Sequence, residues 1–356
     1  MKVPTVSIGL PVYNGADFLQ VALDSLLAQD YRDFELIISD NASVDATSEI
    51  CSKVASDSRV RLFRNDANIG ASENFNRVFR LARGKYFMWA AHDDRWDASY
   101  LDRCIDTLER NASVVICATD VRFIDENGAE LDEETYRLLI EDHNRLHTIS
   151  MGLVERGREL SRTINWYTLY GVIRTETLRK TRIVRNRYAA DVLLLMELLF
   201  HGETMTLPEK LFDYRIIKKT AERQMEAISG AASKEKLRPY TLTAQGLLDV
   251  IAESQFSSAV KRELRDDLLE NVSFANRLWA DRIVDEHRPA ISDSNRLIAS
   301  FQICDLLNGA PIRPPESLYD AAYEKSLRGL PMSERLQTMV RHMLAKHVMW
   351  RFRTKA

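Results

Sequence analysis

The first third of the chain alternates short apolar runs with longer amphipathic stretches, and this alternation limits the folds open to it. Between Thr5 and Thr119, runs rich in Val, Ile, Leu and Phe are each followed by a segment with apolar residues at helical spacing. Parallel strands need such crossovers, so the pattern predicts βαβ units around a mostly parallel sheet. The predicted strands are Val6–Leu10, Phe34–Ser39, Val60–Phe63, Tyr86–Ala90 and Val114–Ala118.

The segments between these strands are predicted helices. In the first of them, apolar spacing predicts an inward stripe of Phe18, Val21, Ala22, Ser25 and Leu26. The predicted helices are Asp17–Gln29, Thr47–Ser56, Ser72–Ala82 and Ser99–Glu109.

The regular alternation ends at the turn Asp125–Gly128, which follows a short run at Val121–Ile124. A mixed region comes next, and beyond about Lys218 the strand signals nearly vanish. The mixed region contains predicted strands at Trp166–Ile173, Met205–Leu207 and Leu211–Ile217, a helix starting at Thr175, and a helix at Val192–Leu199. The last part contains predicted helices at Tyr240–Glu253, Ser257–Val284, Asp293–Leu307 and Pro315–Leu327. We therefore predict an α/β domain over residues 1–220 and a mostly helical extension over residues 221–356.

Composition excludes several classes of protein. A formal net charge of -3 argues against a general nucleic-acid binder. The cysteines Cys51, Cys104, Cys117 and Cys304 lie far apart and form no CxxC pair, so they suggest neither a zinc site nor a disulfide framework. The N-terminus does not read as a signal peptide, and no long apolar run is present. We expect a cytoplasmic protein.

Polar loops follow three of the predicted strands. In open α/β sheets ligands bind beyond the carboxyl ends of the strands, so the loops Pro11–Gly15, Ser39–Thr47 and Ala91–Trp96 are the most informative segments. Each loop alone has a structural explanation, such as helix capping, a turn or a solvated acidic loop. Together they bring an aromatic ring, several carboxylates and backbone donors to one edge, which favours a ligand site.

Four ordered segments resemble the family 2 glycosyltransferases with the GT-A fold. These segments are Val6–Asn14, Ile37–Asp45, Asn68–Gly70 and Gly84–Phe87, and the resemblance extends from about Thr5 to Ile217. It implies a nucleotide-sugar-binding α/β domain with a mostly parallel central sheet flanked by helices. It also implies a nucleotide base between the loop after the first strand and Asp40, whose carboxylate would accept from a uracil or thymine imide N–H. The donor-binding residues implied by the resemblance are Pro11, Val12, Tyr13, Asn14, Asp40, Asn41, Asn74, His92 and Asp93.

The resemblance also implies a divalent metal ion, Mg²⁺ or Mn²⁺, on the donor diphosphate. Asp93 matches the last acid of the family's Asp-any-Asp motif, and Asp94 follows it. The first acid of that motif is replaced by Ala91, but Mg²⁺ often takes only one or two protein carboxylates. His92 is either an additional ligand that favours Mn²⁺ or an ordinary loop residue, and we favour the loop interpretation.

Two further groups of residues concern the donor phosphates and the acceptor. Many relatives carry an Arg near Asn74 for the donor phosphates, so Asn74 or Arg77 must serve instead. Asp191 falls where relatives carry the general base that deprotonates the acceptor hydroxyl, although an acid at a helix start is also a cap. Trp166, Tyr170 and Gly171 precede it, and we assign them to acceptor binding, with core packing as the alternative.

The resemblance implies an inverting, metal-dependent hexosyltransferase. Its substrates would be a UDP- or dTDP-sugar and a hydroxyl of a saccharide or lipid-linked saccharide, in bacterial surface polysaccharide synthesis. The alternative is a catalytically silent nucleotide-sugar-binding or scaffold protein, which Ala91 makes credible. A nucleotidyltransferase would need a Gly-rich, basic phosphate loop where Pro11–Gly15 stands, and the chain has no GxGxxG motif of a dinucleotide oxidoreductase.

The C-terminal tail has the pattern of a basic amphipathic helix. Its apolar residues recur at helical spacing between Leu336 and Val348, and basic residues lie among and after them. Such a helix either packs on its own protein or lies on an anionic membrane surface, which would give peripheral contact with the inner face of the membrane.

Overall fold

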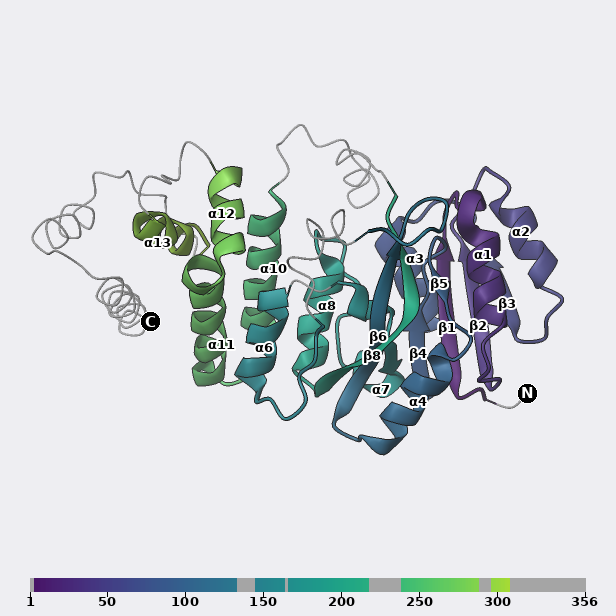
Figure 1. Ribbon diagram of the computed structural model, residues 1–356, viewed down its shortest axis with the longest axis horizontal. Helices are drawn as coiled ribbons and strands as arrows, with labels where there is room; N and C mark the ends of the chain where they lie inside the picture. The colour runs from purple at the N-terminus through teal and green to yellow at the C-terminus, as the bar shows by residue number, and fades with distance from the viewer. Residues whose placement is uncertain (1–2, 133–144, 164–165, 218–237, 288–295, 308–356) are drawn as a thin grey trace, which may run out of the picture. The chain divides into compact units, whose positions relative to one another are not determined.

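The computed structural model describes residues 3–132, 145–163, 166–217, 238–287 and 296–307 (Figure 1). The chain divides into two compact units, Met1–Glu235 and Lys236–Ala356. The predicted domain boundary at residue 220, the predicted helix Pro315–Leu327 and the basic tail lie outside the described residues. Within the described residues, no helix is both long and apolar enough to cross a membrane.

The first unit is built on a mixed sheet with the strand order β3-β2-β1-β4-β7-β6-β8-β5. β1 pairs in parallel with β2 and β4, and β2 pairs in parallel with β3. β7 runs antiparallel to both β4 and β6, while β8 is parallel to β6 and antiparallel to β5. The strands are β1 (Val6–Val12), β2 (Phe34–Asp40), β3 (Val60–Arg64), β4 (Tyr86–Trp89), β5 (Arg95–Trp96), β6 (Val114–Ile124), β7 (Val172–Arg174) and β8 (Glu203–Arg215).

Helices flank this sheet (Figure 1). The helix after β1 buries Leu19, Ala22, Leu23 and Leu26 against the sheet. The prediction is confirmed for Ala22 and Leu26 and was wrong for Phe18, Val21 and Ser25, which are not buried. Both stripes have helical spacing, and only the packing partner selects between them. The helices are α1 (Ala16–Leu27), α2 (Thr47–Val54), α3 (Ala71–Arg80), α4 (Tyr100–Arg110), α6 (Leu153–Thr163), the 3₁₀-helix η1 (Tyr167–Tyr170), α7 (Thr175–Leu178) and α8 (Ala190–Leu199).

The central strands are buried on both faces, as a sheet covered by helices requires. On the face opposite to α1, α3 packs against β1, and its Phe79 meets Phe87 at a ring-centroid distance of 5.1 Å. Phe87 in turn contacts Trp89 edge to face at 4.8 Å. This packing fixes β1 and β4, the strands that lead into two of the polar loops.

The strand directions bring many chain segments to one edge of the sheet. The carboxyl ends of β1, β2, β3 and β4 share that edge because these strands are parallel. β7 runs the opposite way, so the residues before it lie at the same edge, and β6 and β8 again end there. The edge therefore collects the loops after β1, β2 and β4, the residues before β7, and the end of β8.

Several predicted elements differ from the structure. Residues 167–170 form η1 rather than a strand, because Tyr167 and its aromatic neighbours pack as a cluster and tertiary packing outweighs strand propensity. The runs predicted separately at residues 114–118 and 121–124 form the single strand β6, with register shifts around Asp120. The runs at residues 205–207 and 211–217 likewise belong to β8, which ends at Arg215.

The second unit is helical in its described part, as predicted. The single helix predicted at Ser257–Val284 is interrupted, because the Asn276 side chain accepts hydrogen bonds from Leu278 N and Trp279 N and caps a new helix. The helices are α10 (Pro239–Glu253), α11 (Ser258–Glu270), the π-helix η2 (Asn271–Ala275), α12 (Arg277–Glu286) and α13 (Arg296–Leu307).

Gly84→Ala should destabilise the first unit. An added Cβ would lie 2.7 Å from the main-chain nitrogen of Ser7 and 2.8 Å from the main-chain oxygen of Tyr86, so β1 and β4 would have to separate. Such overpacking costs about 1–3 kcal/mol of unfolding free energy, measurable by urea denaturation. In the control Gly152→Ala, the new Cβ would meet only the side chain of Glu155 at 3.4 Å, and the change should stay within about 0.5 kcal/mol. Equal losses in the two variants would contradict this account.

Candidate active site

The loops after β1 and β2 are tied together by hydrogen bonds. The main-chain nitrogen of Asn14 donates to Ser43 Oγ at 2.9 Å, and Val44 N donates to Asn14 Oδ1 at 2.9 Å. Gly15 N donates to Thr47 Oγ1 at 2.9 Å, so the side chain of Thr47, in α2, holds the loop after β1. Asn14 has a φ of 48°, in the left-handed region that Asn tolerates better than most residues. Pro11 and Val12 are the last residues of β1, paired with Ser39 and Asp40 of β2, and the exposed Tyr13 follows them in the loop that these hydrogen bonds hold.

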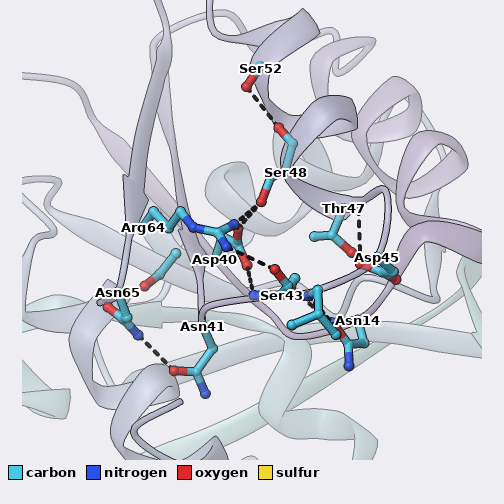
Figure 2. Close-up of polar contacts among 12 residues, drawn as sticks. Asn14, Asp40, Asn41, Ser43, Asp45, Thr47, Ser48, Ser52, Arg64 and Asn65 are labelled. Atoms are coloured by element: carbon cyan, nitrogen blue, oxygen red, sulfur yellow. Dashed lines mark hydrogen bonds and ion pairs between the residues drawn. The ribbon is translucent and has the colours of Figure 1, made fainter. Parts of the chain in front are cut away.

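Asp40 ends β2, and its buried carboxylate is surrounded by donors. Oδ1 accepts from Ser43 N at 2.9 Å, while Oδ2 accepts from Ser48 Oγ and is paired with Arg64 (Figure 2). Burial raises the pKa of this carboxyl, but the hydrogen bonds from Ser43 and Ser48 and the charge of Arg64 outweigh it, so the pKa is lowered. Asp40 is thus held as a carboxylate.

An amide network extends from Asp40 toward α3. Asn41 Oδ1 accepts from Asn65 Nδ2 at 2.8 Å and from Ile69 N at 3.0 Å. Asn74 is buried and bonds Ser39 twice, accepting from its hydroxyl at 2.7 Å and donating to its carbonyl at 2.9 Å. Both polar atoms of the Asn74 side chain therefore already have partners within the domain. Arg77, the alternative phosphate contact, lies on the same helix with its Nε buried and without a hydrogen-bond partner.

The loop after β4 carries the acidic pair. His92 packs on the loop after β1, where an added Cβ on Gly15 would lie only 2.3 Å from its ring. Asp93 is half-buried, while Asp94 is buried and accepts from Arg215 N at 2.8 Å through Oδ1. Asp94 Oδ2 is buried without a hydrogen-bond partner. Burial, and next the charge of Asp93, raise the pKa of Asp94 well above its ordinary value.

This pair fits a divalent cation. Two adjacent carboxylates repel each other, and a buried carboxylate oxygen without a partner is costly, so a cation between them would relieve both penalties. Among the described residues, no group of three or more His, Cys, Asp or Glu side chains forms a metal site. An ion held by Asp93 and Asp94 would therefore need further oxygen ligands from phosphate or water, which is usual for Mg²⁺.

Aromatic residues line the same edge. The rings of Tyr170 and Tyr214 lie 6.4 Å apart, and Trp166 is hydrogen-bonded to Tyr214. Tyr100 Oη donates to the Tyr170 carbonyl at 3.1 Å. Gly171 is buried, and an added Cβ would lie 2.7 Å from the Cys117 carbonyl, so its role here is to let β7 approach β6 closely.

Asp191 lies in the first turn of α8, which packs against η1. It is half-buried, its Oδ1 accepts from Val192 N at 2.9 Å, and burial raises the pKa of its carboxyl. The preceding Ala189 has a φ of 55°, a strained value for alanine. The segment before it is fastened to α3, where the Asn76 side chain bonds both the carbonyl and the amide of Val184 at 2.8 and 3.0 Å.

Three carboxylates affect the pKa of Tyr170. Burial raises the pKa of its hydroxyl well above the ordinary value, and after Tyr214 the charges of Asp94, Asp93 and Asp191 raise it further. Burial also raises the pKa of Tyr214, and the charges of the same three aspartates raise it further. Asp93, Asp94 and Asp191 therefore lie within electrostatic range of one aromatic pair.

Sequence reasoning missed Arg64, Tyr214 and Arg215. All three lie at or next to the carboxyl end of a strand, Arg64 on β3 and the other two on β8. The rule that selected the loops after β1, β2 and β4 would have found Arg64, which follows the predicted strand Val60–Phe63. It would not have found Tyr214 and Arg215, because they lie inside the predicted strand Leu211–Ile217.

Residues 7–167 match the family model described as Glycosyl transferase family 2. An uncharacterized glycosyltransferase of Rickettsia bellii is 32% identical over 126 residues, which cover 35% of this chain and 18% of that protein. One of Rickettsia prowazekii is 34% identical over 115 residues, covering 32% of this chain and 35% of that protein. An uncharacterized protein of Mycobacterium tuberculosis is 36% identical over 126 residues, covering 34% and 36% of the two chains. The chain thus matches only about a fifth to a third of the length of these relatives.

Solved structures share the fold at low sequence identity. Staphylococcus aureus TarS residues 1–349, in complex with UDP-GlcNAc, has a TM-score of 0.55 and 17% identity, covering 85% of this chain and 83% of that chain. A mannosyltransferase from Pyrobaculum calidifontis, in complex with GDP-Man and Mn²⁺, has a TM-score of 0.52 and 16% identity, covering 98% and 87%. Residues 7–167, which carry Asp40, Asp93 and Asp94, therefore match glycosyl transferase family 2 in sequence, and the α/β unit that contains them shares the GT-A fold of these solved structures.

Proposed function

We propose that the chain is an inverting glycosyltransferase, which moves a hexose-like sugar from a UDP- or dTDP-sugar to a hydroxyl of a saccharide or lipid-linked saccharide. The observation that carries this proposal is the Asp93–Asp94 pair, with the buried and partnerless Oδ2 of Asp94, in a domain that matches family 2. Direct displacement needs a place for the donor diphosphate and a separate base for the acceptor hydroxyl. An acidic pair and a third carboxylate close to it meet both needs.

The donor nucleotide would lie between the loop after β1 and Asp40. Asp40 Oδ2 is bonded to Ser48 and Arg64, so Oδ1, which accepts from Ser43 N, would be the oxygen that also accepts from an imide N–H. Exposed Tyr13 would lie beside the base. Complexes of TarS with UDP-GlcNAc and of the mannosyltransferase with GDP-Man support a nucleotide-sugar donor.

Asp93 and Asp94 would hold Mg²⁺ or Mn²⁺ on the donor diphosphate. When bound, the ion would neutralise the negative charge that develops on the nucleoside diphosphate as the sugar–phosphate bond breaks. Asp94 would keep Oδ1 on the Arg215 amide and turn Oδ2 to the ion. The Mn²⁺ in the mannosyltransferase complex supports this assignment.

Asp191 would act as the general base. The carboxylate oxygen that does not accept from Val192 would take the proton of the acceptor hydroxyl, and the raised pKa makes the carboxylate a stronger base. Trp166 and Tyr170 would present aromatic faces to the acceptor sugar. A single attack by the activated hydroxyl inverts the anomeric configuration.

The acceptor class and the place of action extend the same proposal. A role in bacterial surface polysaccharide synthesis would supply a saccharide or lipid-linked acceptor. Cytoplasmic localisation, with peripheral membrane contact through the basic tail, remains a prediction.

The competing function is a catalytically silent nucleotide-sugar-binding scaffold, which Ala91 favours because it removes one acid from the metal motif. Release of nucleoside diphosphate from a panel of UDP-, dTDP- and GDP-sugars with Mn²⁺ or Mg²⁺ separates the two. We expect release from a UDP- or dTDP-sugar. Binding without turnover of any donor, with a broad panel of saccharide acceptors present, would favour the scaffold, and turnover of GDP-sugars alone would contradict the donor assignment.

Asp93→Asn should lower the transfer rate by at least about a hundredfold while the protein stays folded, because the donor diphosphate loses a charged metal ligand. The rate is measured as product formed at saturating donor and Mn²⁺. The control Asp102→Asn changes an exposed carboxylate on α4 and should leave the rate unchanged. Full activity of Asp93→Asn, or of the wild type with excess chelator, would refute the metal assignment.

Asp191→Asn should reduce the transfer rate by roughly two to four powers of ten, the usual share of general-base catalysis, and leave UDP affinity intact. Single-turnover rates and calorimetric titration with UDP measure the two effects separately. Glu176→Gln, at an exposed carboxylate on α7, is the matched control. A parallel loss of UDP affinity would assign Asp191 to the donor side instead.

A further inference from the structure

Arg215, the last residue of β8, is a buried cation that donates to main-chain carbonyls. Its side chain is 6% exposed. Nε donates to the Asp93 carbonyl at 2.7 Å, and Nη1 donates to the carbonyls of Asp125 and Glu126 at 2.9 and 3.2 Å. The guanidinium also lies over the Phe18 ring, 4.7 Å from its centroid. One side chain thus joins the segments that follow β1, β4 and β6 to the end of β8.

The same residue holds the acidic pair from two sides. Its side chain bonds the Asp93 carbonyl, and its main-chain nitrogen donates to Asp94 Oδ1 at 2.8 Å. Fixing Oδ1 sets the rotation of the Asp94 carboxylate, and therefore the direction of the partnerless Oδ2. Fixing the Asp93 carbonyl sets the backbone from which the Asp93 side chain projects.

Charge adds to this geometry. Two neighbouring carboxylates repel, and the positive charge of Arg215 lowers the cost of bringing Asp94 close to Asp93. A lysine would keep this charge, but it lacks the planar fork that reaches several carbonyls from one place. The substitution Arg215→Lys therefore keeps the positive charge and removes the hydrogen-bond geometry of the guanidinium.

We propose that Arg215 is a positioning residue for the Asp93–Asp94 pair and sets its affinity for a divalent cation. This inference rests on the proposed metal-binding function of the pair. Arg215 acts through the loop, without contact to the donor, in the way that residues behind metal ligands commonly tune affinity by about 10- to 100-fold.

The test is the affinity for Mn²⁺, measured by the electron paramagnetic resonance signal of free Mn²⁺ in the presence of UDP. Arg215→Lys should weaken Mn²⁺ binding about tenfold or more, while the affinity for UDP in chelator stays at the wild-type value. The control Arg122→Lys alters an arginine on β6 whose Nε donates to Asp213 Oδ1 at 2.6 Å, and it should leave Mn²⁺ affinity unchanged. Thermal melting checks that both variants are folded.

If Arg215→Lys fails to fold, Phe18→Leu takes its place, because it removes the ring beneath the guanidinium and keeps the hydrogen bonds. A smaller loss of Mn²⁺ affinity, of about two- to fivefold, is then expected, since one of several constraints is removed.

Unchanged Mn²⁺ affinity in a folded Arg215→Lys protein, or in Phe18→Leu where that variant is used, would overturn this inference and leave the proposed metal site standing. Weaker UDP binding by Arg215→Lys in chelator would also overturn it, by making Arg215 a direct donor ligand. A wild-type protein that binds no Mn²⁺ with UDP would overturn the metal assignment and the inference together.

Discussion

The shared direction of β1, β2, β4, β6 and β8 is the constraint on which the site depends. Because these strands end at one edge, segments far apart in the sequence contribute to one place. β7 contributes from the other direction, since it is antiparallel and its preceding residues, including Tyr170, reach the same edge. The apolar strands themselves carry no chemistry, but their burial fixes where each loop begins.

The parts of the fold that were predictable are those with a local signal. The first four strands were found from their apolar runs. Asp40 and Asp93 lie at the carboxyl ends of β2 and β4 as predicted, and their roles stay predictions. The buried face of α1 was predicted only in part, since Phe18 and Leu19 both begin a helical stripe. The sheet buries Leu19, while Phe18 lies under Arg215, nearly two hundred residues away in the chain. Trp166 and Tyr170 resemble strand residues locally, yet aromatic packing makes their segment a 3₁₀-helix.

The two buried acids of the site have opposite electrostatic surroundings. Asp40 has hydrogen-bond donors and a cation around it, which stabilise the carboxylate despite burial. Asp94 has a second acid beside it and an oxygen without a partner, which disfavour the charge. The sequence reveals this difference only in part: Ser43 is three residues from Asp40, but Arg64 and Arg215 reach the two acids only through the folded chain.

The left-handed backbone conformations of Asn14, Ala42 and Ala189 affect how much conformational entropy the site loses when a ligand binds. Non-glycine residues keep such conformations only where the surrounding contacts over-determine them, as the hydrogen bonds of Asn14 do for its loop. Loops held in this way have little conformational entropy left to lose when a ligand arrives. A site with such loops can discriminate strongly between chemically similar ligands. The same loops do not readily change conformation to accommodate dissimilar ligands.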